Sequence, residues 1–66
     1  MKLKNLRSTF SQRVNLYYLM EEEIELIDED VIINDKLYGL LDCTIHKIYA
    51  KVKSNGKPRV CIVLKG

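Results

Sequence analysis

Residues 45–66 read IHKIYAKVKSNGKPRVCIVLKG, and this stretch predicts a β-hairpin. Two runs rich in β-branched residues flank a cluster of turn-forming residues at positions 54–58. A two-residue loop of Asn55 and Gly56 would mix apolar and charged side chains on both faces of the hairpin. A three-residue loop, 54–56, instead places Gly56 in the left-handed position of a turn with a bulge, where glycine has no steric cost. We therefore predict the three-residue loop.

The predicted register divides the hairpin into two faces, because side chains alternate along a strand. It pairs Ala50 with Val60, Ile48 with Ile62 and His46 with Leu64. One face is apolar and is predicted to be core: Ile48, Ala50, Val52, Val60, Ile62 and Leu64. The other face is predicted to be exposed and basic: Lys47, Tyr49, Lys51, Lys53, Arg59, Cys61, Val63 and Lys65, with Lys57 nearby.

Composition indicates one small globular domain, residues 1–66. The chain has 66 residues, of which 47% are hydrophobic and 30% charged, so it is not of the disordered class. A domain of this size buries only about 60% of its unfolded surface, which leaves room for stabilisation as a homodimer. No apolar run approaches the roughly 20 residues that span a membrane, and no apolar segment follows the basic start as in a signal peptide. We expect a protein of the bacterial cytoplasm that does not contact membranes.

The first half of the chain has two interpretations. Leu3, Leu6 and Phe10 recur at helical spacing and predict a short helix ending near residue 12. The same spacing continues to Ile27, which alternatively predicts one long helix over residues 3–27. We favour the short helix, followed by a strand, a charged connection at residues 21–23 and a second strand that begins at residue 24. This first strand has one face formed by Val14, Leu16, Tyr18 and Met20.

The middle of the chain is predicted to contain short elements. Residues 28–30 have the composition of a turn, and residues 31–33 that of a short strand. Asn34 and Asp35 offer an N-cap to a helical piece over residues 36–41, in which Gly39 suggests close packing against a neighbour. The inward-facing residues of that piece are Leu37, Leu40 and Leu41. The predicted fold is α+β: a small antiparallel sheet with a short N-terminal helix, a one-turn middle helix and a C-terminal β-hairpin.

The sequence contains no pattern typical of an enzyme or a metal site. His46, the one histidine, falls on the apolar side of the hairpin and is predicted to be structural and partly buried. Cys43 and Cys61 are predicted to serve as small apolar residues, with a disulfide as the alternative if their strands adjoin. There is no glycine-rich phosphate loop and no zinc-type spacing of cysteine and histidine. We therefore predict a non-catalytic protein without metal or cofactor.

The charges are segregated along the chain. Eight of the nine acidic residues lie between positions 21 and 35, with basic residues before and after them. The candidate acidic binding patch is Glu21, Glu22, Glu23, Glu25, Asp28, Glu29 and Asp30. One interpretation is a solvated edge; the other is a surface that mimics nucleic-acid phosphates and occupies a basic groove of a host protein.

The basic face of the hairpin also has several interpretations. It can be a solvated outer face, or it can dock onto an acidic protein surface. It can also bind nucleic acid, with lysines tracking phosphates while Tyr49 stacks on a base. Three features count against nucleic acid. One aromatic residue is little stacking surface, the pI of the chain is only about 8.6, and the acidic segment repels phosphate unless it lies on the far side.

Across nearly its full length, the chain resembles small uncharacterised proteins encoded by phages and prophages of Gram-positive bacteria. The resemblance follows the order MKLKNL, IELIDEDVII, LYGLLD, IHKIYA and VCIVL, at the level of pattern. It implies no catalytic residues. It implies an accessory protein that binds a host or defence component and inhibits or modulates it.

Overall fold

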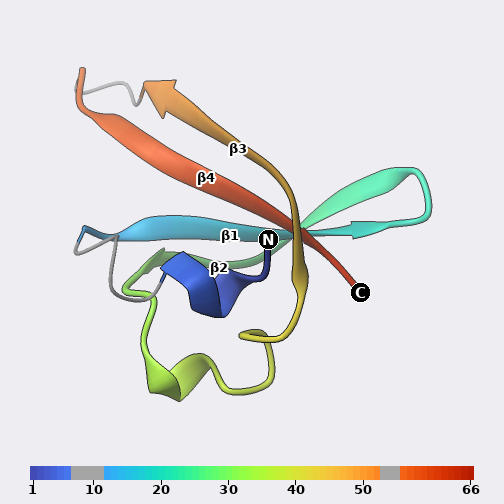
Figure 1. Cartoon of the computed structure of the whole chain (residues 1–66). Helices are drawn as coiled ribbons and strands as arrows, with labels where there is room; N and C mark the ends of the chain where they lie inside the picture. Colours follow the sequence, from blue (N-terminus) through green and yellow to red (C-terminus); the bar gives the residue numbers. More distant parts are fainter. Residues whose placement is uncertain (7–11, 53–55) are drawn as a thin grey trace.

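The computed structural model describes residues 1–6, 12–52 and 56–66, which form a four-stranded sheet with short helical turns on one side (Figure 1). The strands are β1 (Val14–Met20), β2 (Glu23–Val31), β3 (Thr44–Val52) and β4 (Pro58–Lys65). The helices are the 3-10 turns η1 (Leu3–Leu6) and η2 (Asp35–Leu37). The small sheet-rich fold is confirmed. The predicted α-helical content is not, because the helical elements in the described ranges are single 3-10 turns.

The sheet is mixed, with the order β2-β1-β4-β3. β1 pairs antiparallel with β2, and β3 pairs antiparallel with β4. The two central strands, β1 and β4, run parallel, with Val14 opposite Val60 and Tyr18 opposite Leu64. The prediction of an antiparallel sheet was therefore wrong at this pair. Each hairpin is specified locally by its turn, whereas the β1–β4 pairing joins residues far apart in the sequence.

The strand interpretation of residues 14–27 is confirmed, which excludes the long helix. β1 buries Val14 and Leu16, while Tyr18 packs against the same core and Met20 is exposed. A two-residue turn joins β1 to β2, and its first residue, Glu21, has a φ of 55°. η1 ends at Leu6, and the rest of the predicted N-terminal helix, residues 7–11, lies outside the described residues.

β2 continues through the stretch predicted to be a turn. Asp28 lies opposite Leu16 inside the strand, although the register shifts on both sides of Leu16. Asp30 adopts a φ of 59° and its amide donates a hydrogen bond of 3.0 Å to Oδ1 of Asn15. The polar turn residues are therefore accommodated by irregular pairing within one longer strand. Ile33, predicted to be in a separate strand, is instead a buried core residue after the end of β2.

The cap predicted at Asn34 is confirmed. Its Oδ1 accepts a hydrogen bond of 2.9 Å from the amide of Lys36, at the start of η2. The helical piece is shorter than predicted, because only Asp35–Leu37 is a 3-10 helix and a turn follows it. Gly39 has no atom within 4 Å of an added Cβ, so the predicted close packing there is wrong. The inward-facing prediction holds for three residues that pack against the core: Leu37, Leu40 and Leu41.

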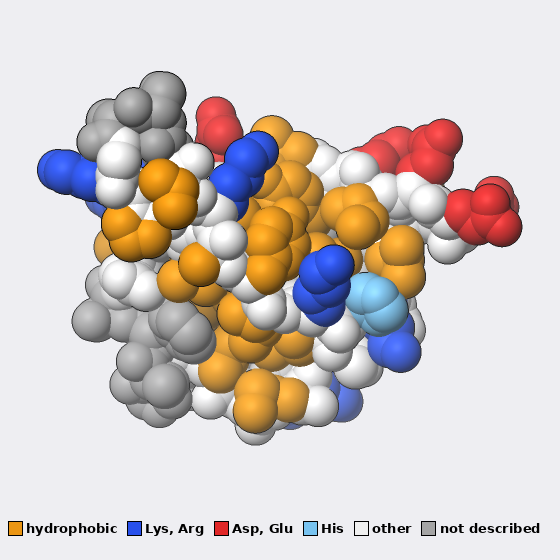
Figure 2. Space-filling model, turned by 90° about the horizontal axis from the view of Figure 1, so that it is seen from above, with side chains coloured by type: hydrophobic (Ala, Val, Ile, Leu, Met, Phe, Trp, Pro, Cys, Tyr) orange, Lys and Arg blue, Asp and Glu red, His pale blue; other side chains and the backbone are white. Residues whose placement is uncertain are grey.

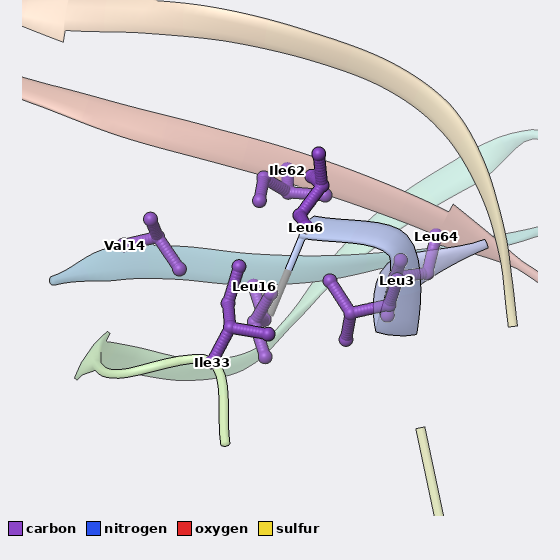
Figure 3. Close-up of a cluster of buried hydrophobic side chains, with 7 residues drawn as sticks. All are labelled: Leu3, Leu6, Val14, Leu16, Ile33, Ile62 and Leu64. Carbon is purple, nitrogen blue, oxygen red and sulfur yellow. The ribbon is translucent and has the colours of Figure 1, made fainter. Parts of the chain in front are cut away.

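The core lies between one face of the central strands and the segments that cover it (Figure 3). Its buried side chains are Leu3, Leu6, Val14, Leu16, Ile33, Ile62 and Leu64. The N-terminal residues are held to the start of β3: the amide of Leu3 donates to the carbonyl of Cys43 at 3.0 Å. The amide of Ile45 donates to the carbonyl of Met1 at 2.8 Å. These bonds place η1 over the core side of β1 and β4.

The predicted register of the C-terminal hairpin is confirmed near its turn and wrong at its base. Ala50 pairs with Val60, and Gly56 has a φ of 83°, as a three-residue loop requires; residues 53–55 lie outside the described residues. A bulge at His46 instead pairs Ile45 with Leu64, and His46 is exposed. The predicted core face is also only half correct. In β4 it is buried or partly buried, but in β3 three residues are exposed: Ile48, Ala50 and Val52.

Candidate binding surfaces

The sheet face opposite the core is termed the open face. η1 and η2 both contribute to the core, so the described helices cover the other side. Strand alternation and register assign to the open face Asn15, Tyr17 and Leu19 of β1, Ile24 and Leu26 of β2, Lys47, Tyr49 and Lys51 of β3, and Arg59, Cys61, Val63 and Lys65 of β4.

Cys61 and Val63 are buried at the centre of the open face, although both were predicted to be exposed. Each has 0% of its surface accessible. The register explains why, because Val63 lies between Tyr17 and Lys47, and Cys61 lies between Asn15 and Tyr49. Long side chains from the neighbouring strands thus shield the centre of β4 from water. The open face has a small buried layer of its own.

Tyr17 and Tyr49 form an aromatic pair around the thiol of Cys61. Burial, and then the neighbouring Cys61 thiol, raise the pKa of both phenols, and Tyr49 adds to the effect on Tyr17. Nζ of Lys47 lies 5.3 Å from the ring centroid of Tyr49, within the range of a cation–π contact. Tyr17 was not among the predicted site residues. The alternation of VNLYYLM could have identified it, because Tyr17 must face away from the core when Leu16 and Tyr18 face it.

The predicted basic residues are only partly brought together. Lys47, Lys51 and Lys65 are exposed on the open face. Arg59 is engaged in an ion pair, with Nη1 2.7 Å from Oδ1 of Asp30, and its side chain is 19% exposed. Lys57 is exposed just before β4, and the predicted Lys53 lies outside the described residues.

The predicted acidic patch does not form one surface. Glu21 and Glu22 lie at the turn between β1 and β2, and all seven residues of the patch are exposed. Glu23 and Glu25 lie opposite Met20 and Tyr18, so their side chains are on the core side of the sheet. The other members lie further along β2: Asp28 opposite Leu16, then Glu29, then Asp30 with Arg59.

The β1–β2 hairpin projects beyond the rest of the sheet, and residues 19–25 are termed the arm. β4 pairs with β1 only from Val14 to Tyr18, so no third strand formed by residues 1–6, 12–52 or 56–66 lies beside the arm. Its apolar side chains are accessible: Met20 is 53% exposed and Ile24 48%. In Figure 1 the arm extends to the right, and in Figure 2 acidic side chains gather at this same end, beside a band of hydrophobic side chains.

A hollow of about 400 Å³ lies at the other end of β2. It is lined by Arg13, Asp28, Asp30, Val31, Ile32, Asn34, Lys36 and Leu37. Nη1 of Arg13 donates a hydrogen bond of 2.9 Å to the carbonyl of Asp30, which fixes one wall. Charges of both signs line the hollow, so it has no net preference for an anion or a cation.

Cys43 is a half-buried free thiol and Cys61 a buried one. Within residues 1–6, 12–52 and 56–66, no three histidine, cysteine or acidic side chains are grouped so that they could hold a metal ion. None of the helices in those ranges has the length and apolar character needed to cross a lipid bilayer.

Comparisons with known proteins returned no relative: no protein-family model, no curated protein and no solved structure matches this chain.

Proposed function

We propose that this chain is a non-catalytic binding protein of phage or mobile-element type. It acts in the bacterial cytoplasm, where it inhibits or modulates a host or defence protein by occupying its surface. The observation that carries the proposal is the arm, in which exposed apolar side chains alternate with carboxylates on a projecting hairpin. A small chain gains nothing in stability from apolar side chains held in water, so their exposure favours a role in binding.

The edge of the sheet at β2 supports a protein partner. β2 is a nine-residue strand that, in the described part of the chain, has a neighbour on one side only, and its residues from Glu23 to Asp30 are exposed. A free edge presents backbone N–H and C=O groups to which a strand from another protein can be added. Carboxylates along this edge repel a second copy of the same strand. They favour a partner segment that carries lysine or arginine.

The acidic patch is spread over the turn between β1 and β2 and separate parts of β2, so only some of its residues are proposed to contact the partner. Asp30 is engaged with Arg59, and Asp28 lies beside the hollow at the far end of β2. The proposed contact set is therefore the arm itself: Met20, Glu21, Glu22, Glu23, Ile24 and Glu25. A partner suited to it has an apolar groove bordered by basic residues, because apolar burial supplies affinity while opposite charge speeds association and selects the partner.

The proposal is tested with two charge variants of the tagged protein. The protein is used as bait in lysates of candidate bacterial hosts, and any captured protein is purified and titrated against it by calorimetry. The arm variant Glu21→Lys/Glu22→Lys should weaken binding of the purified partner by at least about tenfold, as expected for loss of close charge pairs. The control, Lys47→Gln/Lys51→Gln on the open face, should bind as the wild type does. A partner that binds the arm variant with unchanged affinity would contradict the proposal.

A further inference from the structure

We propose that the open face binds single-stranded nucleic acid, with bases stacked on Tyr17 and Tyr49 and phosphates held by Lys47, Lys51 and Lys65. This inference uses the tyrosines and lysines of the open face rather than the residues of the arm, and it does not rest on the proposed function. Two of the features that counted against nucleic acid in the sequence were the single aromatic residue and the nearby acidic segment. The fold changes both of these.

The fold supplies a second aromatic residue next to the first. Tyr17 of β1 and Tyr49 of β3 lie on the two sides of β4, two strand spacings or roughly 10 Å apart. Both side chains are partly exposed, and both interact with the thiol of Cys61 between them. The register therefore places both rings beside the buried Cys61 and Val63, and both still reach solvent. Exposed aromatic side chains on a sheet are the usual platform for unpaired bases, since every base has a flat face to stack.

The charges are separated by the sheet itself. Lys47, Lys51 and Lys65 share the open face with the tyrosines, and Lys47 already contacts the ring of Tyr49. The register places Glu23 and Glu25 on the opposite side, so these two carboxylates point away from a strand bound on the open face.

Asp30 is paired with Arg59 of the open face, with 2.7 Å between its carboxylate oxygen and Nη1 of the guanidinium. The open face is therefore net positive among the described residues, although the whole chain carries only +2. This face therefore attracts phosphates through Lys47, Lys51 and Lys65.

The geometry favours unpaired over duplex nucleic acid. The tyrosines emerge from the middle of a sheet face, where they can meet the flat face of a base only if that base is unstacked from its neighbours. A duplex would offer this surface its phosphates but not its base faces. Only the three lysines would therefore contribute to the affinity for a duplex.

Fluorescence anisotropy with labelled oligonucleotides of about 12 nucleotides tests the proposal, a length within the usual site size of small sheet domains. Oligo-dT and oligo-rU separate DNA from RNA as the ligand, and a duplex of the same length is the comparison. With three lysines neutralised by phosphates, the affinity for a single strand should fall about 20-fold when salt rises from roughly 50 to 200 mM. The duplex should bind more weakly than the single strand.

Matched variants separate stacking from charge. Tyr17→Leu and Tyr49→Leu retain an apolar cover over Cys61 and Val63, and each should weaken binding by roughly 5- to 100-fold. Tyr17→Phe and Tyr49→Phe retain the ring and should bind like the wild type. Thermal melting of each variant is the control that checks whether the fold is kept.

The charge variants change the salt dependence. Lys47→Gln/Lys51→Gln/Lys65→Gln should make the affinity almost independent of salt. Glu23→Gln/Glu25→Gln, on the other side of the sheet, should change it by less than about threefold. An arm variant on the opposite side of the sheet, Met20→Ser, should leave oligonucleotide binding intact, which separates this test from that of the proposed function.

Three outcomes would overturn the inference. The first is no binding of either single strand at low salt. The second is equal binding of single strand and duplex. The third is displacement of the oligonucleotide by polyglutamate combined with full binding by the Tyr→Leu variants, because the surface would then recognise acidic proteins through charge alone.

Discussion

Replacing Val63 by aspartate places a carboxylate at a position with 0% of its surface accessible. The loss of buried valine costs about 2 kcal/mol, from the area removed from water. Burying a carboxylate without a cationic partner costs several kcal/mol more, so the total exceeds roughly 5 kcal/mol. A domain of 66 residues has a free energy of unfolding of roughly 3–10 kcal/mol. Val63→Asp is therefore expected to leave the chain largely unfolded at room temperature.

The matched control is Val52→Asp, the same substitution in the other strand of the same hairpin. Val52 is 69% exposed, so Val52→Asp should change the free energy of unfolding of the protein by about 0.5 kcal/mol or less. Urea denaturation followed by far-ultraviolet circular dichroism measures both variants. A Val63→Asp protein that unfolds at the wild-type urea concentration would show that the open face has no buried layer and would refute the reasoning.

Three further changes test other features. Asn15→Ala removes the acceptor for the Asp30 amide and should cost about 1–2 kcal/mol in urea denaturation; no loss would contradict this. Glu21→Gly should raise the free energy of unfolding by about 0.5–1 kcal/mol, since glycine tolerates the φ of 55° at this position. A lower melting temperature than that of the wild type would count against this prediction. Burial and the neighbouring Cys61 thiol raise the pKa of Tyr17 and of Tyr49, so these phenols keep their protons to a higher pH in the folded state than in the unfolded chain. The free energy of unfolding should be constant below the ordinary tyrosine pKa of 10.0 and should fall as pH rises through the raised pKa values of the folded state. Ultraviolet titration of the wild type against the two Tyr→Phe variants checks this.

Local features of the fold could be predicted from the sequence. The hairpin register near Gly56, the cap at Asn34 and the alternation of Val14, Leu16 and Tyr18 each depend on a few neighbouring residues. Such features follow from turn chemistry and from the two-residue period of a strand. The physical causes lie within the segment itself, so the sequence displays them directly.

Features set by distant segments could not be predicted. Nothing in the pattern of residues 58–65 indicates that β4 pairs parallel with β1, and this pairing makes β4 a central strand. A central strand has neighbours on both sides that shield both of its faces, which is why Cys61 and Val63 are buried. β3 is instead an edge strand, so Ile48 and Val52 remain exposed although they continue the apolar face.

The candidate sites were predicted as residue sets but not as surfaces. The acidic and basic residues were identified, yet only the register shows that Glu23 and Glu25 lie on one side of the sheet and Lys47 and Lys51 on the other. The bulges near Leu16 and at His46 also change which residues face each side. Bulges depend on how two strands fit together, and a single strand's sequence rarely specifies them.

The central position of β4 has a consequence for how the protein is made. β4 is the last of the four strands to leave the ribosome, yet β1 obtains its second neighbour from it. Until then β1 is paired only with β2, in a two-stranded unit that is marginally stable in water, and Val14 and Leu16 lack their core neighbours Ile62 and Leu64. Pairing between distant segments is also slow, on the order of milliseconds to seconds. Folding is therefore expected to follow synthesis in one cooperative step, and a nascent chain that stops before β4 should be degraded by proteases rather than persist as a partly active fragment.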